Sequence, residues 1–368
     1  MNLTLSSFAQ DNISTHQNNH MQFHKLKVAN TQQLTPLSKK ITFDLPNDLK
    51  TSYSFKSGQY VSIELNIDGN VLRRSYSICS PSSVKDSFSI GVKEIIDGYG
   101  SKFLNQSIKA GDILEVSLPE GGFLLNEISK DYQYVFVAGG SGITPVLSML
   151  HELLSHTTSA VFLKYSTLSK EETMFYDELK ELEAKNPNLK IDFLFTNGEN
   201  ILNEQNLAQW IKSLPVTNYN VWVCGPAGII SATEKACQII GLSPEKFHRE
   251  YFTAKSAEDM QSASVGSSND APLSPGEAAE VEIKYEGKKL KFTCQYNETI
   301  LDAALNAGGD PPYSCLVAAC STCRAMIKTG NIEMKDRDAL SDKDIAKGFV
   351  LTCQSMPRSK KVILDYDE

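Results

Sequence analysis

The stretch "YQYVFVAGGSGITPVLSMLHELL", residues 132–154, decides the fold of the central part of this chain. It reads as an apolar run, then a glycine turn, then a helical pattern. Similar strands follow at "AVFLKYSTL", "KIDFLFTNG" and "NYNVWVCGPAGII", with helical patterns such as "SKEETMFYDELKELEAK" between them. Strands that alternate with helices predict a parallel sheet covered by helices on its faces. We therefore expect an α/β domain over residues 128–253.

Glycines at the ends of two of these strands indicate a nucleotide site. Gly139, Gly140 and Gly142 separate a buried strand from a helix, which is the geometry that cradles phosphates, although the spacing is not G-x-G-x-x-G. Cys224, Gly225 and Pro226 follow a second strand. Small residues at the carboxyl ends of parallel strands line the crevice where ligands bind. Cys224 can equally be a core cysteine, the commoner role of a buried thiol.

Residues 22–127 have a different sequence pattern. Short segments in which apolar and polar residues partly alternate are interrupted by Gly, Pro and Asn. This spacing predicts an antiparallel β-barrel. Within it, "RRSYSICS" places Arg74, Tyr76 and Ser77 where they can neutralise a phosphate, pack on a ring and hydrogen-bond a flavin nitrogen. Arg and Ser are also ordinary residues on a solvated barrel face. The pattern becomes more specific beside "GVKEIIDGYGSKFL", residues 91–104, which predicts a helix start.

That helix start offers backbone N–H groups to an anion. Gly98, Gly100 and Ser101 lie where the helix begins, and free N–H groups there suit a pyrophosphate. The alternative is an ordinary helix closed by a side-chain cap.

The last section, residues 280–368, contains "PYSCLVAACSTCRA". Its spacing, Cys315-x4-Cys320-x2-Cys323 with Cys353 after 29 further residues, matches the C-x4-C-x2-C…C pattern of a [2Fe–2S] cluster. One iron would take two thiolates from the loop, while the other would take the third thiolate and Cys353. Small residues between the ligands (Ala318, Ala319, Ser321 and Thr322) let backbone N–H groups approach the cluster.

The cysteines could instead bind zinc, form disulfides or lie in the core. Structural zinc usually needs a second knuckle or a histidine, and none accompanies Cys353. Eight cysteines in 368 residues is not the density of a disulfide scaffold, and we expect a reducing, cytoplasmic compartment. Four unrelated buried cysteines would not explain three within nine residues. The iron–sulfur interpretation is favoured.

Composition excludes several classes of partner. The net charge of −8 argues against nucleic acid and anionic membranes, and no apolar run is long enough to span a bilayer. We expect residues 1–21 to form a flexible N-terminal tail. Residues 254–279, rich in Ser, Ala, Gly and Pro, predict a flexible linker that would let the last domain swing.

The motifs carry two resemblances. Residues 280–368 resemble a plant-type ferredoxin domain, which implies a β-grasp fold, although Ala318 stands where such loops usually carry Gly. If that position needs a positive φ, Ala318 would be mildly strained. The ordered set R-x-Y-S, G-x-x-S, GGSGITP, CGP and "REYF" resembles the ferredoxin–NADP reductase superfamily, and the domain order resembles reductase components of multicomponent oxygenases, including the phenylacetyl-CoA epoxidase type.

These resemblances imply cofactors and roles. FAD, preferred over FMN, would contact Arg74, Tyr76, Ser77, Val92, Lys93, Gly98, Gly100 and Ser101. NADH or NADPH would contact Gly139, Gly140, Gly142, Thr144, Cys224, Gly225 and Pro226. Glu250 and Phe252 would face the isoalloxazine, and Ser77, Cys224 and Glu250 would be catalytic.

The resemblance implies an NAD(P)H-dependent reductase that passes electrons through flavin and a [2Fe–2S] cluster to an oxygenase partner. One alternative is a different one-electron acceptor, such as a hybrid-cluster protein or a desaturase. Another is that the last domain only docks or folds and binds no iron. The sequence leaves open NADH against NADPH, because Lys164 and Lys170 stand near Glu171 and Glu172, and it leaves open the oligomeric state.

Overall fold

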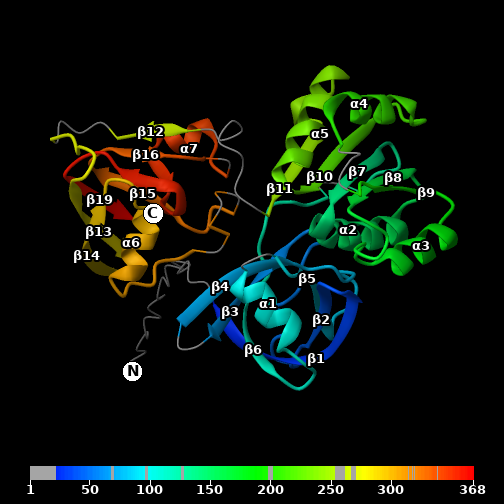
Figure 1. Cartoon of the computed structure of the whole chain (residues 1–368), viewed down its shortest axis with the longest axis horizontal. Coiled ribbons are helices and arrows are strands. Elements are labelled where there is room, and N and C mark those ends of the chain that lie inside the picture. The colour runs from blue at the N-terminus through cyan, green and yellow to red at the C-terminus, as the bar shows by residue number, and fades with distance from the viewer. Residues whose placement is uncertain are drawn as a thin grey trace, which may run out of the picture.

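The computed structural model shows three domains, a barrel, an α/β domain and a C-terminal domain (Figure 1). It describes residues 22–67, 70–95, 98–125, 128–197, 202–252, 262–266, 271–313, 315–316, 318, 320–337 and 339–368. The predicted tail, residues 1–21, and Ala319 of the cysteine loop lie outside the described residues. In the described part of the chain, no helix is long and apolar enough to cross a membrane.

Six antiparallel strands form the first domain, in the order β4-β3-β6-β1-β2-β5. An antiparallel bridge between Ile78 and Ile90 joins the two ends of this order, and the Cys79 N–H donates to the Ser89 carbonyl at 2.8 Å. The sheet therefore closes on itself, as the alternating sequence predicted. The strands are β1 (Phe23–Thr35), β2 (Ser38–Asp44), β3 (Tyr60–Ile67), β4 (Asn70–Ser77), β5 (Ser87–Lys93) and β6 (Ile113–Ser117), with helix α1 (Tyr99–Gln106) between β5 and β6.

The second domain has the predicted parallel sheet, in the order β11-β10-β7-β8-β9. Helices α2 and α3 pack on one face and α4 and α5 on the other. The elements are β7 (Gln133–Gly139), η1 (Gly140–Gly142), α2 (Ile143–His156), β8 (Val161–Thr167), α3 (Tyr176–Lys185), β9 (Leu189–Phe195), α4 (Glu204–Ser213), β10 (Tyr219–Gly225), α5 (Ala227–Ile239), η2 (Pro244–Lys246) and β11 (Phe247–Tyr251).

Strand β7 explains why the deciding stretch is apolar throughout. Tyr134 and Phe136 face the core beneath α2, whereas Val135 and Val137 face the cores beneath α4 and α5. A strand covered on both faces shows no alternation in its sequence.

The strand order reverses between β7 and β10, and the two strand ends meet there through glycine backbones. A Cβ on Gly142 would lie 2.1 Å from the Cys224 carbonyl oxygen. A Cβ on Gly225 would lie 2.9 Å from the Gly139 nitrogen. These glycines are therefore required by close backbone packing, in addition to any contact with phosphate. Such a reversal point is where open α/β sheets bind ligands.

The third domain holds a five-stranded sheet, in the order β14-β13-β19-β15-β17, and a three-stranded sheet, β12-β16-β18. Helix α6 packs with the core of this domain. The elements are β12 (Ala263–Val265), β13 (Ala278–Tyr285), β14 (Lys288–Gln295), α6 (Ile300–Asn306), β15 (Arg324–Thr329), β16 (Ile332–Met334), α7 (Asp342–Ala346), β17 (Phe349–Leu351), η3 (Thr352–Gln354), β18 (Ser355–Pro357) and β19 (Lys361–Asp365).

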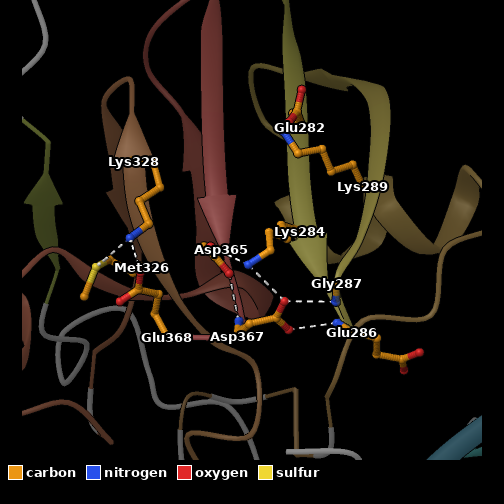
Figure 2. A network of polar contacts seen from close by, with 10 residues as sticks. All are labelled: Glu282, Lys284, Glu286, Gly287, Lys289, Met326, Lys328, Asp365, Asp367 and Glu368. Atoms are coloured by element: carbon orange, nitrogen blue, oxygen red, sulfur yellow. Dashed lines mark hydrogen bonds and ion pairs between the residues drawn. The ribbon is translucent and has the colours of Figure 1, made fainter. Parts of the chain in front are cut away.

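The predicted hairpin around "EGKK" is present as β13 and β14. Its turn is held by hydrogen bonds to Asp367, which lies near the end of the sequence. Glu286 and Gly287 both have positive φ, 56° and 68°, as a two-residue hairpin turn requires. The Asp367 carboxylate accepts both of their N–H groups at 2.8 and 3.0 Å (Figure 2). Lys284 adds ion pairs of 3.2 Å to Asp365 and to Asp367.

The segment expected to be a flexible linker is in part ordered. Residues 253–261 and 267–270 lie outside the described residues, but β12 pairs with β16 in the third domain. Val265 and Leu273 are buried in the core of that domain. For these residues the expectation of a flexible tether is wrong, because two apolar side chains in the polar stretch suffice to anchor it.

Candidate functional site

A cavity of about 650 Å³ lies where the three domains meet. Side chains from the barrel, the α/β domain and the cysteine loop line it together. The predicted residues in its wall are Arg74, Tyr76, Ser77, Lys93, Gly98, Gly100, Ser101, Thr144, Glu250, Phe252, Cys315 and Cys320. A volume of this size suits a ligand as large as a cofactor.

The barrel side of the cavity has the chemistry that a flavin nucleotide needs. Tyr76 and Ser77 lie on β4. Burial raises the pKa of the Tyr76 phenol further above neutral pH, so the phenol stays uncharged. The Arg74 guanidinium lies on the same strand, and its Nη1 donates to the Arg73 carbonyl at 2.7 Å. One cation, one aromatic ring and one hydroxyl thus share one wall, as the R-x-Y-S motif predicted.

Helix α1 begins at the cavity without a side-chain cap. Gly98 is the residue before the helix, and it has no side chain that could accept a hydrogen bond from the first turn. The Ser101 hydroxyl instead donates to the Gly98 carbonyl at 3.1 Å and accepts from the Ile95 N–H at 3.2 Å, which holds the preceding loop. Among the residues that the structure describes, none supplies the side-chain cap of an ordinary helix start, and first-turn N–H groups of this kind suit a diphosphate.

Strand β5 separates two residues that were predicted together. Lys93 lines the cavity, but the Val92 side chain is fully buried in the barrel core. Side chains alternate along a strand, so neighbours cannot face the same side. The Val92 side chain therefore faces away from the cavity, and the predicted contact of Val92 with the cofactor could involve only its backbone.

On the α/β side, the helix start after β7 reaches the cavity through two hydroxyl residues. Ser141 and Thr144 line the wall, and the Thr144 hydroxyl donates to the Ser141 carbonyl at 2.9 Å. Gly140 has φ of 52°, and the Tyr165 hydroxyl donates to its carbonyl at 2.9 Å.

Cys224 lies behind this wall. It is fully buried, and burial raises the pKa of its thiol well above the ordinary value. It is absent from the cavity lining, as are Gly139, Gly140, Gly142, Gly225 and Pro226 among the described residues. The structure therefore places Cys224 next to Glu250 across the β10–β11 pair rather than in the cavity itself.

Glu250 is a partly buried residue in the cavity wall, and the Oε2 atom of its carboxyl group is buried. Burial first, and Cys320 second, raise the pKa of Glu250 to about 8, so the carboxyl is mostly protonated at neutral pH. Its Oε2 atom has no hydrogen-bond partner in the described structure. An unpaired polar atom in a buried site is costly unless a ligand satisfies it. Phe252 lines the same cavity, and its predicted contact with the isoalloxazine stays a prediction.

The four predicted iron ligands lie in the third domain as two pairs. Cys315 interacts with Cys320, and the Cys315 N–H donates to the Cys320 sulfur at 3.4 Å, while Cys323 interacts with Cys353. The described residues contain no group of three ligands placed for a single metal ion. Two cysteine pairs fit a cluster with two irons better than one mononuclear ion.

The backbone of the loop is shaped for an anionic cluster. Leu316, Ala318 and Ser321 all have positive φ, between 54° and 63°. Left-handed residues of this kind build concave nests of N–H groups that bind anions. The sequence flagged Ala318 as a position of mild strain, and its φ of 59° agrees with that expectation. The Gln354 side chain donates to the Leu316 carbonyl at 2.9 Å and so ties the loop to η3.

The cavity wall also contains Tyr60 and Tyr99, which the motifs did not reveal. Tyr60 and Cys320 line both the large cavity and a polar cavity of about 450 Å³ beside the cysteine loop. Tyr99 lies at the rim with 79% of its surface exposed. The contact between the flavin region and Cys315 and Cys320 has no sequence signal, because it joins residues far apart in the chain.

Family models match three successive segments of the chain. They describe an oxidoreductase FAD-binding domain at residues 25–124, an oxidoreductase NAD-binding domain at 136–235 and a 2Fe-2S iron-sulfur cluster binding domain at 283–358. The fold and the site therefore define an NAD(P)H oxidoreductase with FAD and [2Fe–2S] cofactors.

Similar proteins share the whole arrangement. The chain is 30% identical to one subunit of the 1,2-phenylacetyl-CoA epoxidase of Escherichia coli (strain K12), over 94% of this chain and 98% of that protein. It belongs to the same family as that protein. A 3-ketosteroid-9-alpha-monooxygenase ferredoxin reductase component of Rhodococcus rhodochrous is 28% identical, with 93% of this chain and 96% of that protein covered. The solved structure of phthalate dioxygenase reductase matches with a TM-score of 0.63, 26% identity and coverage of 93% and 98%.

Proposed function

We propose that this oxidoreductase is the reductase component of an oxygenase, of the phenylacetyl-CoA epoxidase type. A single observation carries the proposal. Arg74 and Ser77 of the barrel, Glu250 of the α/β domain, and Cys315 and Cys320 of the third domain line one cavity. A flavin bound there would touch both the nucleotide side and the iron–sulfur side.

Each group of residues has a distinct task in this scheme. Flavin accepts a hydride from a nicotinamide and releases electrons one at a time to a cluster, which is chemistry the cofactors supply. Arg74 and the start of α1 would hold the flavin phosphates. Ser77 would offer a hydroxyl to the ring, and the Glu250 carboxyl group would lie beside it in the cavity wall.

The relatives support an oxygenase as the partner. Two similar proteins are named as parts of an epoxidase and of a ketosteroid monooxygenase, which are different oxygenation systems. We propose the epoxidase type because that relative is covered over 98% of its length at 30% identity. The four cysteines outside the predicted cluster, Cys79, Cys224, Cys237 and Cys294, are buried and not disulfide-bonded, and a cytoplasmic compartment is proposed on that basis.

The test begins with the purified protein. We expect bound FAD, two irons per chain, and cytochrome c reduction with NADH or NADPH, whose rates also decide the preferred nucleotide. Cys320→Ser should abolish cytochrome c reduction and leave flavin reduction intact. Normal cytochrome c reduction by that variant would show that the last domain only docks, and a colourless protein would refute the proposal. Addition of the purified oxygenase component of an epoxidase should then produce NAD(P)H-dependent oxygenation.

A further inference from the structure

Arg73 joins the barrel to the iron–sulfur domain. The residue is buried, and it lies on β4 beside the predicted flavin residue Arg74. Nη1 and Nη2 each lie 2.8 Å from a carboxylate oxygen of Asp310, and Nε donates to Glu64 at 2.7 Å. The guanidinium therefore bridges a carboxylate of its own domain and a carboxylate of the third domain. Such two-point pairs fix orientation as well as distance.

Aromatic contacts strengthen the same junction. The Arg73 Cζ atom lies 5.1 Å from the ring centre of Phe23 in the barrel and 5.1 Å from that of Tyr313 in the third domain. Arg is suited to such stacking because its guanidinium is planar and weakly hydrated. Asp310 and Tyr313 both lie within five residues of Cys315. The contacts thus act on the segment that leads directly into the cluster loop.

We propose that the Arg73–Asp310 pair is a latch that positions the cysteine loop against the flavin cavity and so controls electron transfer from flavin to cluster. Arg73 is a positioning residue, because it does not line the cavity and acts through the segment before Cys315. The proposal rests on the proposed function, since it concerns the step between the two cofactors.

The different exposure of the partners explains why the Arg73–Asp310 ion pair can break without leaving a buried charge unpaired. The Asp310 side chain is 63% exposed, whereas those of Arg73 and Glu64 are 11% and 27% exposed. When the domains separate, Asp310 is readily hydrated and Arg73 keeps Glu64 as a counter-ion. No buried charge is left alone, which is the costly outcome in most broken ion pairs.

The test removes the exposed partner. In Asp310→Ala we expect nucleotide-driven flavin reduction to keep its rate and flavin-to-cluster transfer to slow at least about tenfold, as loss of one charge-assisted pair implies. Stopped-flow absorbance separates the two steps. Small-angle scattering of the holoprotein should show a larger radius of gyration. The wild-type transfer rate should fall as salt is raised, whereas that of the variant should not.

Matched variants make the result specific. Asp342→Ala removes the same charge from the same domain, but Asp342 pairs with Arg337 within that domain at 2.6 Å, so transfer should be unchanged. The double variant Arg73→Ala/Asp310→Ala should be no slower than the slower single variant. If flavin-to-cluster transfer in Asp310→Ala proceeds at the wild-type rate, the latch proposal is wrong. Absence of flavin-to-cluster transfer in the wild type itself overturns the proposed function instead.

Discussion

Replacement of Gly142 by Ala tests whether the nucleotide site depends on the close approach of β7 and β10. The added Cβ would lie 2.1 Å from the Cys224 carbonyl oxygen, 2.3 Å from its carbon and 2.6 Å from the Gly225 nitrogen. Ordinary contact begins at 3.4 Å, so the start of α2 must move by about 1.3 Å, the difference between 3.4 and 2.1 Å. All three obstructing atoms are backbone, so no side chain can rotate away.

Overpacking of this kind costs about 1–3 kcal/mol or more. We expect a value near 3 kcal/mol, which lowers the melting temperature by about 6–12 °C at roughly 2–4 °C per kcal/mol. Ser141 and Thr144 move with the helix start, so the KM for the nicotinamide nucleotide should rise at least about tenfold, as a binding loss of 1.4 kcal/mol implies. Calorimetry and steady-state kinetics measure the two effects.

Gly228→Ala is the matched control for stability. Apart from the neighbouring backbone of its own helix, no atom of the described residues lies within 4 Å of the position of its Cβ, and Gly228 lies in helix α5. The variant should be as stable as the wild type, or more stable by up to about 1 kcal/mol from helix propensity. An unchanged melting temperature and KM in Gly142→Ala would refute the close-packing argument.

Three further predictions concern the other domains. Cys353→Ser should lose its iron and the visible absorption of the cluster but keep bound flavin; two irons per chain would contradict the assigned ligand. Tyr99→Ala should weaken FAD binding about tenfold but leave FMN binding unchanged in titrations of the flavin-free protein, because an exposed ring at the rim can stack on adenine. Burial raises the pKa of Asp367, but the N–H groups of Gly287 and Glu286 outweigh it and lower that pKa. Asp367→Asn should therefore cost about 1–2 kcal/mol at pH 7, and the difference should shrink below about pH 4; equal denaturation midpoints at pH 7 would contradict this.

The sequence predicted features that depend on neighbouring residues. The alternation of residues 22–127, the strand–glycine–helix pattern from Tyr132 and the hairpin around Glu286 are local, so their periods and turn residues specify them. The helix start at Gly98 and the positive φ of Ala318 belong to the same group. Each of these follows from steric rules that act over a few residues.

Features that depend on contacts between residues far apart in the chain could not be predicted from the sequence. Arg73 looks like any charged residue on a solvated strand, and its partner Asp310 is 237 positions away. The sequence assigned Val92 and Lys93 to the same cofactor site. Side chains alternate along β5, so these two neighbours face opposite sides of the strand. Cys224 belongs to a recognisable motif, but only the packing around β10 shows that its thiol is buried behind the cavity wall.

All three cofactor regions belong to one chain. This lowers the affinity that the interface between the barrel and the third domain, at Arg73 and Asp310, must provide. A separate ferredoxin would have to find the flavin domain by diffusion, and its interface would need enough affinity to work at cellular concentration. A covalently attached domain experiences an effective concentration in the millimolar range. One ion pair and two ring contacts at Arg73 can then suffice for docking. A weak interface also separates quickly, so fast turnover and correct alignment need not compete.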